Sequence, residues 1–442
     1  MTSIRGGSTV SATRGGVWKA IAMVGFLYFV IGFVTWLNGP LISFVQVAFN
    51  LGDVGAFLVP MVFYISYLVL ALPASRILQA TGMKRGLVLA LVVMAVGTAI
   101  FGQFVSLRSY GGALSGLFVL GAGLALLQTA INPYISIIGP IEAAAQRIAL
   151  MGICNKVAGL LAPIVLGALV LRDMGGIAGK VAHTSDPQQR DALLTGFAHQ
   201  VYIPYLGMAL LLVLAALFVA RSSLPDIDPK TSNRSALAGD QERARGLPTA
   251  PHLWFGILCL FLYVGAEVMA GDAIGTYGRG FHLPLDQTKF FTSFTLAAMV
   301  VGYVVGFLLT PHVLSQERYL ALSAVAGLVF TTLALLTSGY SSVLWVAALG
   351  FANAMMWPAI FPLAIRGLGA KTEIGSALLI MGICGGAIVP QIYVHLKQTH
   401  DFQTMFWVVM APIYCYILFY GLIGARVPQD RAHLPAAPGL DV

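Results

Sequence analysis

The sequence predicts an all-α membrane protein whose twelve transmembrane helices form two pseudo-twofold-related six-helix bundles, with both termini in the cytoplasm. Composition is the first observation: 58% of the 442 residues are apolar and 10% are charged, whereas soluble proteins carry about 25% charged residues. So few charges could not cover a water-facing surface, and the same scarcity excludes a disordered chain. The other two observations are the number of long apolar runs and an internal repeat between the halves of the chain.

Twelve apolar runs have the length of about 20 residues with which a helix crosses the hydrocarbon core of a membrane. The first run follows a polar N-terminus and is too long for a signal-peptide core, so we expect it to remain in the protein as a helix. In chain order the runs cover residues 17–38, 55–79, 86–106, 111–138, 147–171, 200–220, 253–278, 288–310, 319–338, 341–366, 373–397 and 402–425.

The runs divide the chain into an N-terminal six-helix bundle (1–220), a cytoplasmic linker (221–251) and a C-terminal six-helix bundle (252–442). The linker is rich in Ser, Pro, Asp and Arg and has no apolar period, which is typical of a connecting segment. The stretch 172–199, between spans five and six, is expected to be a long polar loop on the outer side.

The basic residues orient the helices. With the N-terminus inside, seventeen Lys and Arg fall in inner segments and seven in outer segments. Cytoplasmic segments of membrane proteins carry this excess, so both termini are expected in the cytoplasm. The net charge of +8 has the same origin and does not indicate a nucleic-acid partner.

The two halves repeat each other in sequence. Met151-Gly-Ile-Cys154 in span five recurs as Met381-Gly-Ile-Cys384 in span eleven. One span earlier in each half, a pair of residues four apart precedes a proline, and such a pair shares one helix face. These pairs are Gln128 with Asn132 in span four and Asn353 with Trp357 in span ten. A duplicated six-helix unit with a central inner linker is the architecture of the major facilitator transporters, which bind substrate between their halves near the midplane.

Three ionisable residues lie inside apolar runs, where a charge is costly and is a functional candidate by default. Lys156 follows Arg147 by nine residues, which places it roughly 13 Å from the inner end of span five. Glu267 lies near the middle of span seven and Asp272 nearer its end. We expect all three to take part in substrate or ion coupling, with Glu267 as the coupling carboxylate. The alternatives are a structural ion pair between Lys156 and Glu267, and a solvated outer vestibule around Asp272.

Amides and indoles on the spans that line the cavity in this architecture favour a sugar as the substrate. Amides bond hydroxyl groups as donors and acceptors, and the apolar face of a sugar ring can stack on an indole. Each amide also has a structural alternative, because a hydrogen bond to a neighbouring helix would satisfy it equally well. The candidates for substrate binding are Trp36, Asn38, Gln128, Asn132, Asn155, Asn353 and Trp357.

Several stretches resemble the fucose/glucose–galactose symporter branch of the major facilitator superfamily, and the likeness runs from about residue 20 to 425. The stretches are Phe33-Val-Thr-Trp-Leu-Asn38-Gly39-Pro-Leu-Ile42, Gln128-Thr-Ala-Ile-Asn-Pro-Tyr134, Tyr263-Val-Gly-Ala-Glu267-Val and Trp357-Pro-Ala-Ile-Phe361. The resemblance implies sugar transport across the plasma membrane. Because of Glu267 and Gln128, the chain is more similar to the glucose/galactose and N-acetylglucosamine carriers than to the fucose carrier.

The chain departs from this branch at three positions. The fucose/proton symporters carry an Asp after Leu-Asn in the first span and a Glu in the fourth-span motif, where this chain has Gly39 and Gln128. Those carboxylates carry the proton in the fucose type, so its coupling scheme cannot be transferred. In the fifth-span Phe-Asn-Ser motif, Asn155 matches the Asn and Lys156 replaces the Ser.

We therefore expect a multi-pass plasma-membrane carrier (bacterial inner membrane) that imports a monosaccharide, of glucose/galactose or N-acetylglucosamine type, by alternating access. Coupling to a proton or to sodium is expected; the alternatives are an uncoupled facilitator and a multidrug exporter of the same fold. The sequence has no Walker loop and no metalloprotease motif, so no ATP, metal, cofactor or enzymatic activity is expected. The expected partners are the sugar, the coupling ion and the lipid bilayer, and the protein is expected to be a monomer.

Overall fold

The structure, a computed structural model, describes residues 14–137, 144–171, 174–222, 250–310, 313–368 and 371–426. Side chains are described in these ranges except at 14–20, 132–137, 144–146 and 372–373. Most of the expected linker lies outside the described residues, so the boundaries of the two bundles stay a prediction.

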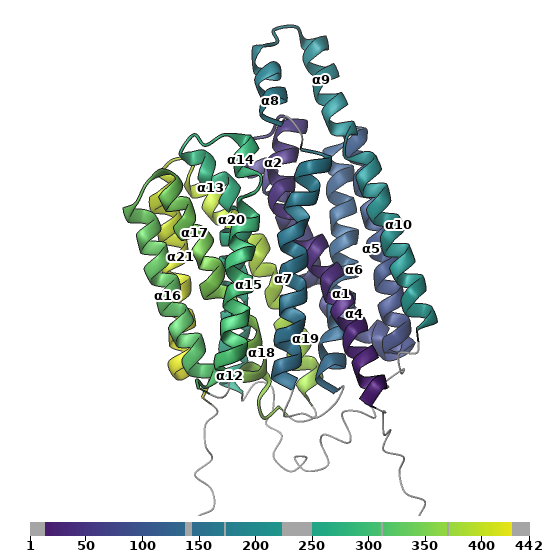
Figure 1. Cartoon of the computed structure of the whole chain (residues 1–442), viewed down its shortest axis with the longest axis vertical. Coiled ribbons are helices and arrows are strands. Elements are labelled where there is room, and N and C mark those ends of the chain that lie inside the picture. The colour runs from purple at the N-terminus through teal and green to yellow at the C-terminus, as the bar shows by residue number, and fades with distance from the viewer. Residues whose placement is uncertain are drawn as a thin grey trace, which may run out of the picture.

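The twelve predicted spans are confirmed. The described part of the chain contains twelve helical segments long and apolar enough to cross a membrane, and they run side by side along the long axis of the molecule (Figure 1). The first half contributes α1 (Arg14–Thr35), α2 (Asn38–Ala48), α3 (Asp53–Ala56), α4 (Leu58–Thr81), α5 (Met83–Ser106), α6 (Tyr110–Ile137), α7 (Ala144–Leu169), α8 (Met174–His183), α9 (Pro187–His199) and α10 (Tyr202–Arg221).

The second half is built in the same way from shorter pieces. It contains α12 (Pro251–Gly271), α13 (Ile274–Gly280), α14 (Leu285–Thr288), α15 (Phe291–Leu309), α16 (Gln316–Leu336), α17 (Gly339–Asn353), α18 (Met356–Ile365), α19 (Thr372–Met381), the 3-10 turn η5 (Gly382–Cys384), α20 (Gly385–Leu396), α21 (Phe402–Phe419) and the π-helical turn η6 (Tyr420–Gly424).

The outward faces of the helices are apolar, as a bilayer requires. On α10, the side chains of Leu210 and Leu211 are 60% and 66% exposed. On the opposite face of α10, Tyr205 is buried and packs on Phe101 of α5 at a centroid distance of 4.7 Å. Exposed apolar surface of this extent marks contact with lipid, so the chain is a multi-pass membrane protein.

The contacts of the two halves correspond as the internal repeat predicts. α7 of span five packs against α1 and α15, and the helices of span eleven pack against α12 and α4. These contacts are equivalent if spans one, two and five correspond to spans seven, eight and eleven. The repeated tetrapeptide differs locally, because 151–154 continues α7 whereas Gly382–Cys384 forms the turn η5.

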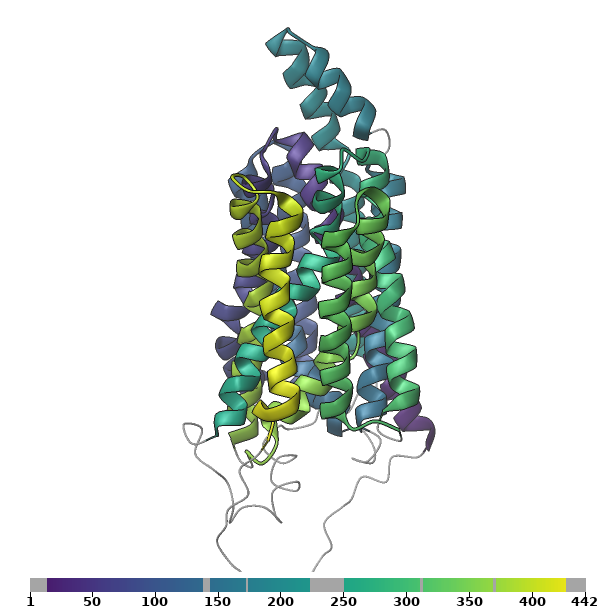
Figure 2. The ribbon, with the colours of Figure 1, turned by 90° about the vertical axis from the view of Figure 1, so that its left-hand side faces the viewer.

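The outer stretch 172–199 is not a polar loop, and that expectation was wrong. It forms α8 and α9, a helical hairpin that projects beyond the ends of the bundles (Figures 1 and 2). The Asp186 carboxylate accepts a 3.0 Å hydrogen bond from the N–H of Gln188 and so caps α9. Phe197 of α9 packs on Phe44 of α2 at a centroid distance of 5.0 Å, and this burial stabilises a helix whose sequence is polar overall.

The hairpin touches both bundles. α9 contacts α2 and α5 of the first bundle, and α8 contacts α14 of the second. Beside α8, the backbone carbonyl of Leu171 accepts a 2.7 Å hydrogen bond from the ammonium of Lys289.

Spans one, seven and ten are each interrupted within their length. Span one breaks at Trp36 and Leu37 between α1 and α2, and span seven breaks at Asp272 and Ala273 between α12 and α13. Span ten breaks between α17 and α18. Non-helical backbone at membrane depth is tolerated where it is buried in protein or lines a cavity, and in transporters such breaks mark binding sites.

The predicted orientation, with the hairpin outside, can be tested with a membrane-impermeant maleimide on intact cells. Ser185→Cys should be labelled, because Ser185 is exposed at the tip of the hairpin. Val313→Cys, at a position 67% exposed before α16, should react only after permeabilisation. The parent protein is the control, since its four cysteines lie within the spans. The opposite labelling pattern would refute the N-in topology.

Candidate functional site

A cavity of about 110 Å³, lined by both polar and apolar side chains, lies between the two bundles. This volume is below the range of about 300–1,000 Å³ that is typical of small-molecule sites, so the bundles have to move apart for a ligand to enter. Spans one, two, four and five of the first bundle and spans seven, eight, ten and eleven of the second contribute to its walls. The broken spans one, seven and ten are among them.

Six of the ten site residues predicted from the sequence line this cavity: Trp36, Gln128, Asn155, Lys156, Glu267 and Trp357. Asn38, Asp272 and Asn353 lie outside it and are almost completely buried. The side chain of Asn132 falls outside the described residues.

An ion pair between the bundles dominates the electrostatics of the cavity. The ammonium of Lys156 on α7 lies 2.8 Å from the carboxylate Oε1 of Glu267 on α12, and the two side chains are only 8% and 12% exposed. The same ammonium lies 4.5 Å from the ring centroid of Trp36, which is a cation–π contact. The sequence left the pairing of these charges open, and in this conformation they pair.

The cavity amides make hydrogen bonds that a ligand can replace. Gln128 Nε2 donates to the hydroxyl of Tyr67 at 3.1 Å. Asn155 accepts from Nε1 of Trp36 and donates to the backbone carbonyl of Tyr28, both at 3.4 Å. These two distances exceed the usual upper limit of about 3.2 Å, so Asn155 is free to improve its bonding when a hydroxyl group enters.

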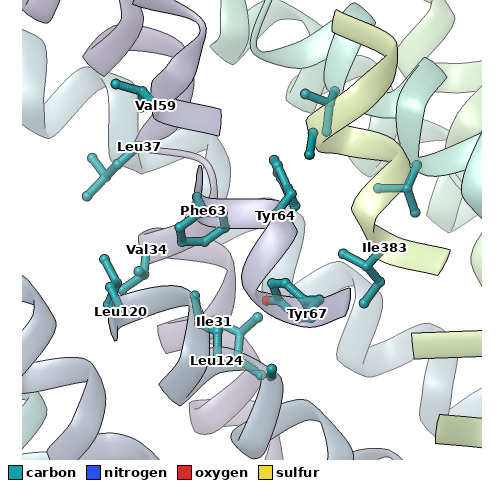
Figure 3. Close-up of a cluster of buried hydrophobic side chains, with 14 of the residues drawn as sticks. Ile31, Val34, Leu37, Val59, Phe63, Tyr64, Tyr67, Leu120, Leu124 and Ile383 are labelled. Atoms are coloured by element: carbon teal, nitrogen blue, oxygen red, sulfur yellow. The ribbon is translucent and has the colours of Figure 1, made fainter. Parts of the chain in front are cut away.

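Five tyrosines that the sequence pattern did not single out complete the polar wall: Tyr28, Tyr64, Tyr67, Tyr263 and Tyr303. Figure 3 shows Tyr64 and Tyr67 on α4, with Ile383 of the other bundle across from them. Helical spacing is the sequence signal that could have identified some of these tyrosines, because residues three or four apart share one face of a helix. Tyr64 and Tyr67 are three apart, and Tyr263 precedes Glu267 by four.

Asn353 has a structural role instead of lining the cavity, because its amide hydrogen-bonds to a neighbouring helix. Its Oδ1 accepts a 2.9 Å hydrogen bond from the hydroxyl of Tyr414, which joins α17 to α21 inside the second bundle. Asn38, at the start of α2, is 1% exposed beside Tyr64. Substrate contact by either amide would require another conformation.

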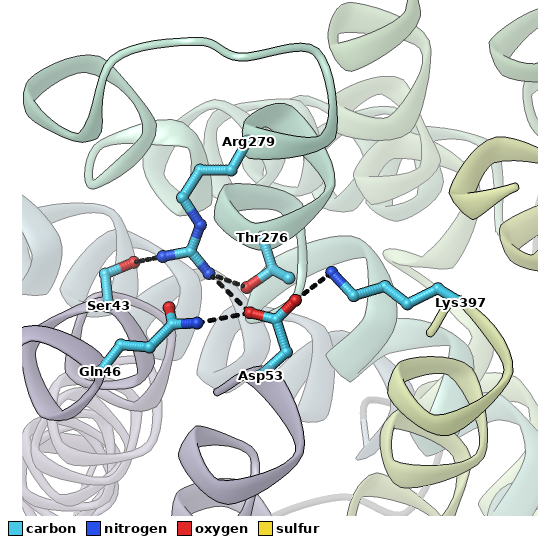
Figure 4. Close-up of polar contacts among 6 residues, drawn as sticks. All are labelled: Ser43, Gln46, Asp53, Thr276, Arg279 and Lys397. Carbon is cyan, nitrogen blue, oxygen red and sulfur yellow. Dashed lines mark hydrogen bonds and ion pairs between the residues drawn. The ribbon is translucent and has the colours of Figure 1, made fainter. Parts of the chain in front are cut away.

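A second polar cluster, the outer network, joins the bundles at the end that carries the hairpin. The Asp53 carboxylate of α3 is its centre: it accepts a hydrogen bond from Gln46 of the same bundle and pairs with Lys397 and, at 3.4 Å, with Arg279 of the other. The six residues of the network, three from each bundle, are Ser43, Gln46, Asp53, Thr276, Arg279 and Lys397 (Figure 4). Arg279 and Lys397 are two of the seven basic residues that the sequence analysis assigned to outer segments.

Known proteins similar to this chain are membrane transporters. The family model described as Major Facilitator Superfamily matches residues 24–390. The glucose/galactose transporter of Brucella abortus is 33% identical over 92% of this chain and 94% of its own length. The L-fucose-proton symporter of Escherichia coli is 26% identical over 84% of this chain and 85% of its own. A crystal structure of the transporter FucP in the outward conformation matches with a TM-score of 0.73 and 23% identity, covering 92% of this chain and 99% of that one.

Removing one partner of the central ion pair should destabilise the protein more than removing both. Lys156→Met leaves the Glu267 carboxylate without a counter-charge, so we expect the free energy of unfolding to fall by about 3 kcal/mol. The double variant Lys156→Met/Glu267→Gln should recover most of that loss, because no uncompensated charge remains. Thermal unfolding of the purified variants in detergent measures both effects. A double variant as unstable as Lys156→Met would argue against the pair.

Proposed function

The chain belongs to the major facilitator superfamily, and we propose that it imports a monosaccharide across the bacterial inner membrane by alternating access. The observation that carries the proposal is the cavity between the bundles, which combines amides, tyrosine hydroxyls and half-buried indole surface with a single ion pair. The names of the two relatives, a glucose/galactose transporter and an L-fucose-proton symporter, support a hexose. A monomer is part of the proposal, because both bundles that line the cavity belong to one chain.

The chemistry of the cavity suits an uncharged, hydroxyl-rich ligand. Gln128 and Asn155 each offer a donor and an acceptor, and sugar hydroxyls are both. Lys156 and Glu267 can form charge-assisted hydrogen bonds with hydroxyl groups at the edge of the pair. A ligand with fewer hydroxyls would leave some of these buried groups unpaired, and this is the basis of selectivity.

Trp357 is the better stacking surface of the two predicted indoles. Its ring lies beside that of Phe361, with centroids 6.0 Å apart and planes 18° apart, at the cavity wall. Trp36 is 2% exposed, and Lys156 occupies its ring face. We therefore assign ring stacking to Trp357 and assign to Trp36 the positioning of the ion pair.

Alternating access requires the bundles to separate at one end while they close at the other. At the hairpin end, the outer network ties α3 to α13 and to Lys397 just after α20. The Asp53 carboxylate at the centre of the outer network is 26% exposed, so water can hydrate it once its partners move away. The outer network can therefore break and re-form in every cycle, and the residues of each bundle move as one body.

Cation coupling is part of the proposal. If the Lys156–Glu267 pair opens during the cycle, Glu267 can take up a proton or sodium. If the pair stays closed and no other acid takes up a cation, the protein is an uncoupled facilitator. The relative named as a proton symporter favours a proton over sodium.

Sugar binding should depend on the cavity amides. Gln128→Ala and Asn155→Ala should each weaken binding by about 1–3 kcal/mol, the usual cost of leaving buried polar partners unpaired. Asn353→Ala is the matched control and should keep the parent affinity, because its amide bonds Tyr414 away from the cavity. Counterflow in proteoliposomes, competed by glucose, galactose, mannose, N-acetylglucosamine and fucose, measures affinity and identifies the substrate.

The same assay separates the proposal from its main alternative. A parent protein that exchanges none of these sugars but expels cytotoxic dyes from cells would be a multidrug exporter. Equal affinities in the parent, Gln128→Ala and Asn155→Ala would show that the sugar binds elsewhere.

A further inference from the structure

Asp272 is a buried carboxylate outside the cavity. It lies at the break between α12 and α13 and is 1% exposed. Neither of its carboxylate oxygens makes a hydrogen bond of normal geometry with any described residue. Buried polar groups are normally paired, so this exception needs a physical reason.

From α2 of the first bundle, Asp272 is faced by Gly39. A β-carbon on Gly39 would lie 3.3 Å from Oδ1 of Asp272, and the backbone N–H of Gly39 approaches the carboxyl group. Along the chain, Gly39 comes three residues after Trp36, which packs on Gly271, and four residues before Ser43, which accepts a hydrogen bond from Arg279. The contact therefore belongs to the seam that closes the hairpin end.

The groups around Asp272 leave its charge uncompensated. Glu267 and Lys156 are the charged groups that act on it, and they already neutralise each other. From α4 it is faced by the phenol Tyr64, and from α15 by Thr292, whose hydroxyl donates to the carbonyl of Gly271 at 2.8 Å. An ionised Asp272 would add one net negative charge in a region closed to water, which is strongly unfavourable. One bound proton makes the group of three neutral.

We propose that Asp272 carries the proton that is coupled to sugar import; this inference rests on the proposed sugar transport. While the bundles are apart at the hairpin end, a proton from the outer water adds to a carboxylate oxygen of Asp272. Sugar draws the bundles together around the cavity, and closure buries the neutral acid against Gly39. An ionised Asp272 opposes that closure, so sugar and proton move together.

The cycle ends on the inner side. The O–H bond of Asp272 breaks there, and the proton leaves through the cavity past Trp36 and Tyr64, the wall residues that lie against Gly271 and Asp272. The newly ionised carboxylate again disfavours closure at the hairpin end, which drives the return of the empty carrier. No group other than Asp272 changes its protonation state in this scheme.

Glu267 is the poorer proton carrier in this arrangement. Protonating it would leave the ammonium of Lys156, which is 8% exposed, without a counter-charge. Protonating Asp272 removes a charge that has no partner, whereas protonating Glu267 leaves the charge of Lys156 without a partner. The two carboxylates, five residues apart in the sequence, are thereby assigned different roles.

The test uses purified full-length protein in proteoliposomes with an imposed proton gradient. The parent should concentrate sugar and take up protons with it, as followed by a pH-sensitive dye. Asp272→Asn should keep sugar counterflow but lose both accumulation and sugar-linked proton uptake. Asp191→Asn, at a side chain 70% exposed in the outer hairpin, is the matched control and should behave as the parent does.

A swap variant separates a proton role from a merely structural one. In the double variant Gly39→Asp/Asp272→Ala, residue 39 carries the carboxyl group in place of residue 272. The new carboxyl group occupies the space left by the shortened side chain of residue 272, and the Thr292 hydroxyl turns away to make room. It should regain the proton-driven accumulation that Asp272→Ala alone loses. A swap variant that exchanges sugar without concentrating it would contradict the assignment.

Three other results would overturn the proposal. In the first, Asp272→Asn accumulates sugar to the parent level. In the second, Asp272→Asn has normal thermal stability but loses counterflow. In the third, the parent needs a sodium gradient instead of a proton gradient to accumulate sugar. A parent that exchanges no sugar at all would instead overturn the proposed function, so the two failures are distinguishable.

Discussion

The contact between Lys156 and Glu267 is the interaction on which the site depends. Each residue is tolerable at its depth only because the other lies 2.8 Å away, since an unpaired charge in so dry a region is strongly disfavoured. The pair links α7 to α12, and its ammonium lies over Trp36, which in turn bonds Asn155. Because the pair is neutral as a unit, the remaining wall can consist of amides and phenols, and such a wall favours an uncharged ligand.

The polar contacts between the bundles differ in how much water reaches them, and this difference suits a rocking motion. The central pair is desolvated and resists opening. In the outer network, the Asp53 side chain is 26% exposed and its partners Arg279 and Lys397 are 18% and 12% exposed, so water reaches the carboxylate and can hydrate it as the partners move away. In the proposed cycle, the bundles therefore pivot about the centre and part at the end. The breaks in spans one and seven lie between these two levels, where the helices must adjust.

The twelve spans and the repeat could be predicted because hydropathy, run length and a recurring tetrapeptide are local properties of the sequence. The cost of a buried charge likewise singled out Lys156, Glu267 and Asp272. What the sequence could not supply was which groups meet across the bundles. Asn155 and Asn353 both lie within apolar spans, yet one faces the cavity and the other bonds Tyr414. The outer network and the hairpin depend in the same way on contacts between distant segments, so composition described 172–199 only as polar.

The hairpin has a consequence for controlling the protein from the side of the membrane that is predicted to be the outer one. It lies across the seam, with α9 resting on α2 of one bundle and α8 touching α14 of the other. When the bundles rock, at least one of these two contacts has to slide. An antibody fragment that clamped α8 to α14 would therefore arrest transport without entering the cavity or competing with the sugar. The helical hairpin, which composition alone describes as a loop, would thus be a site at which transport can be inhibited without blocking the cavity.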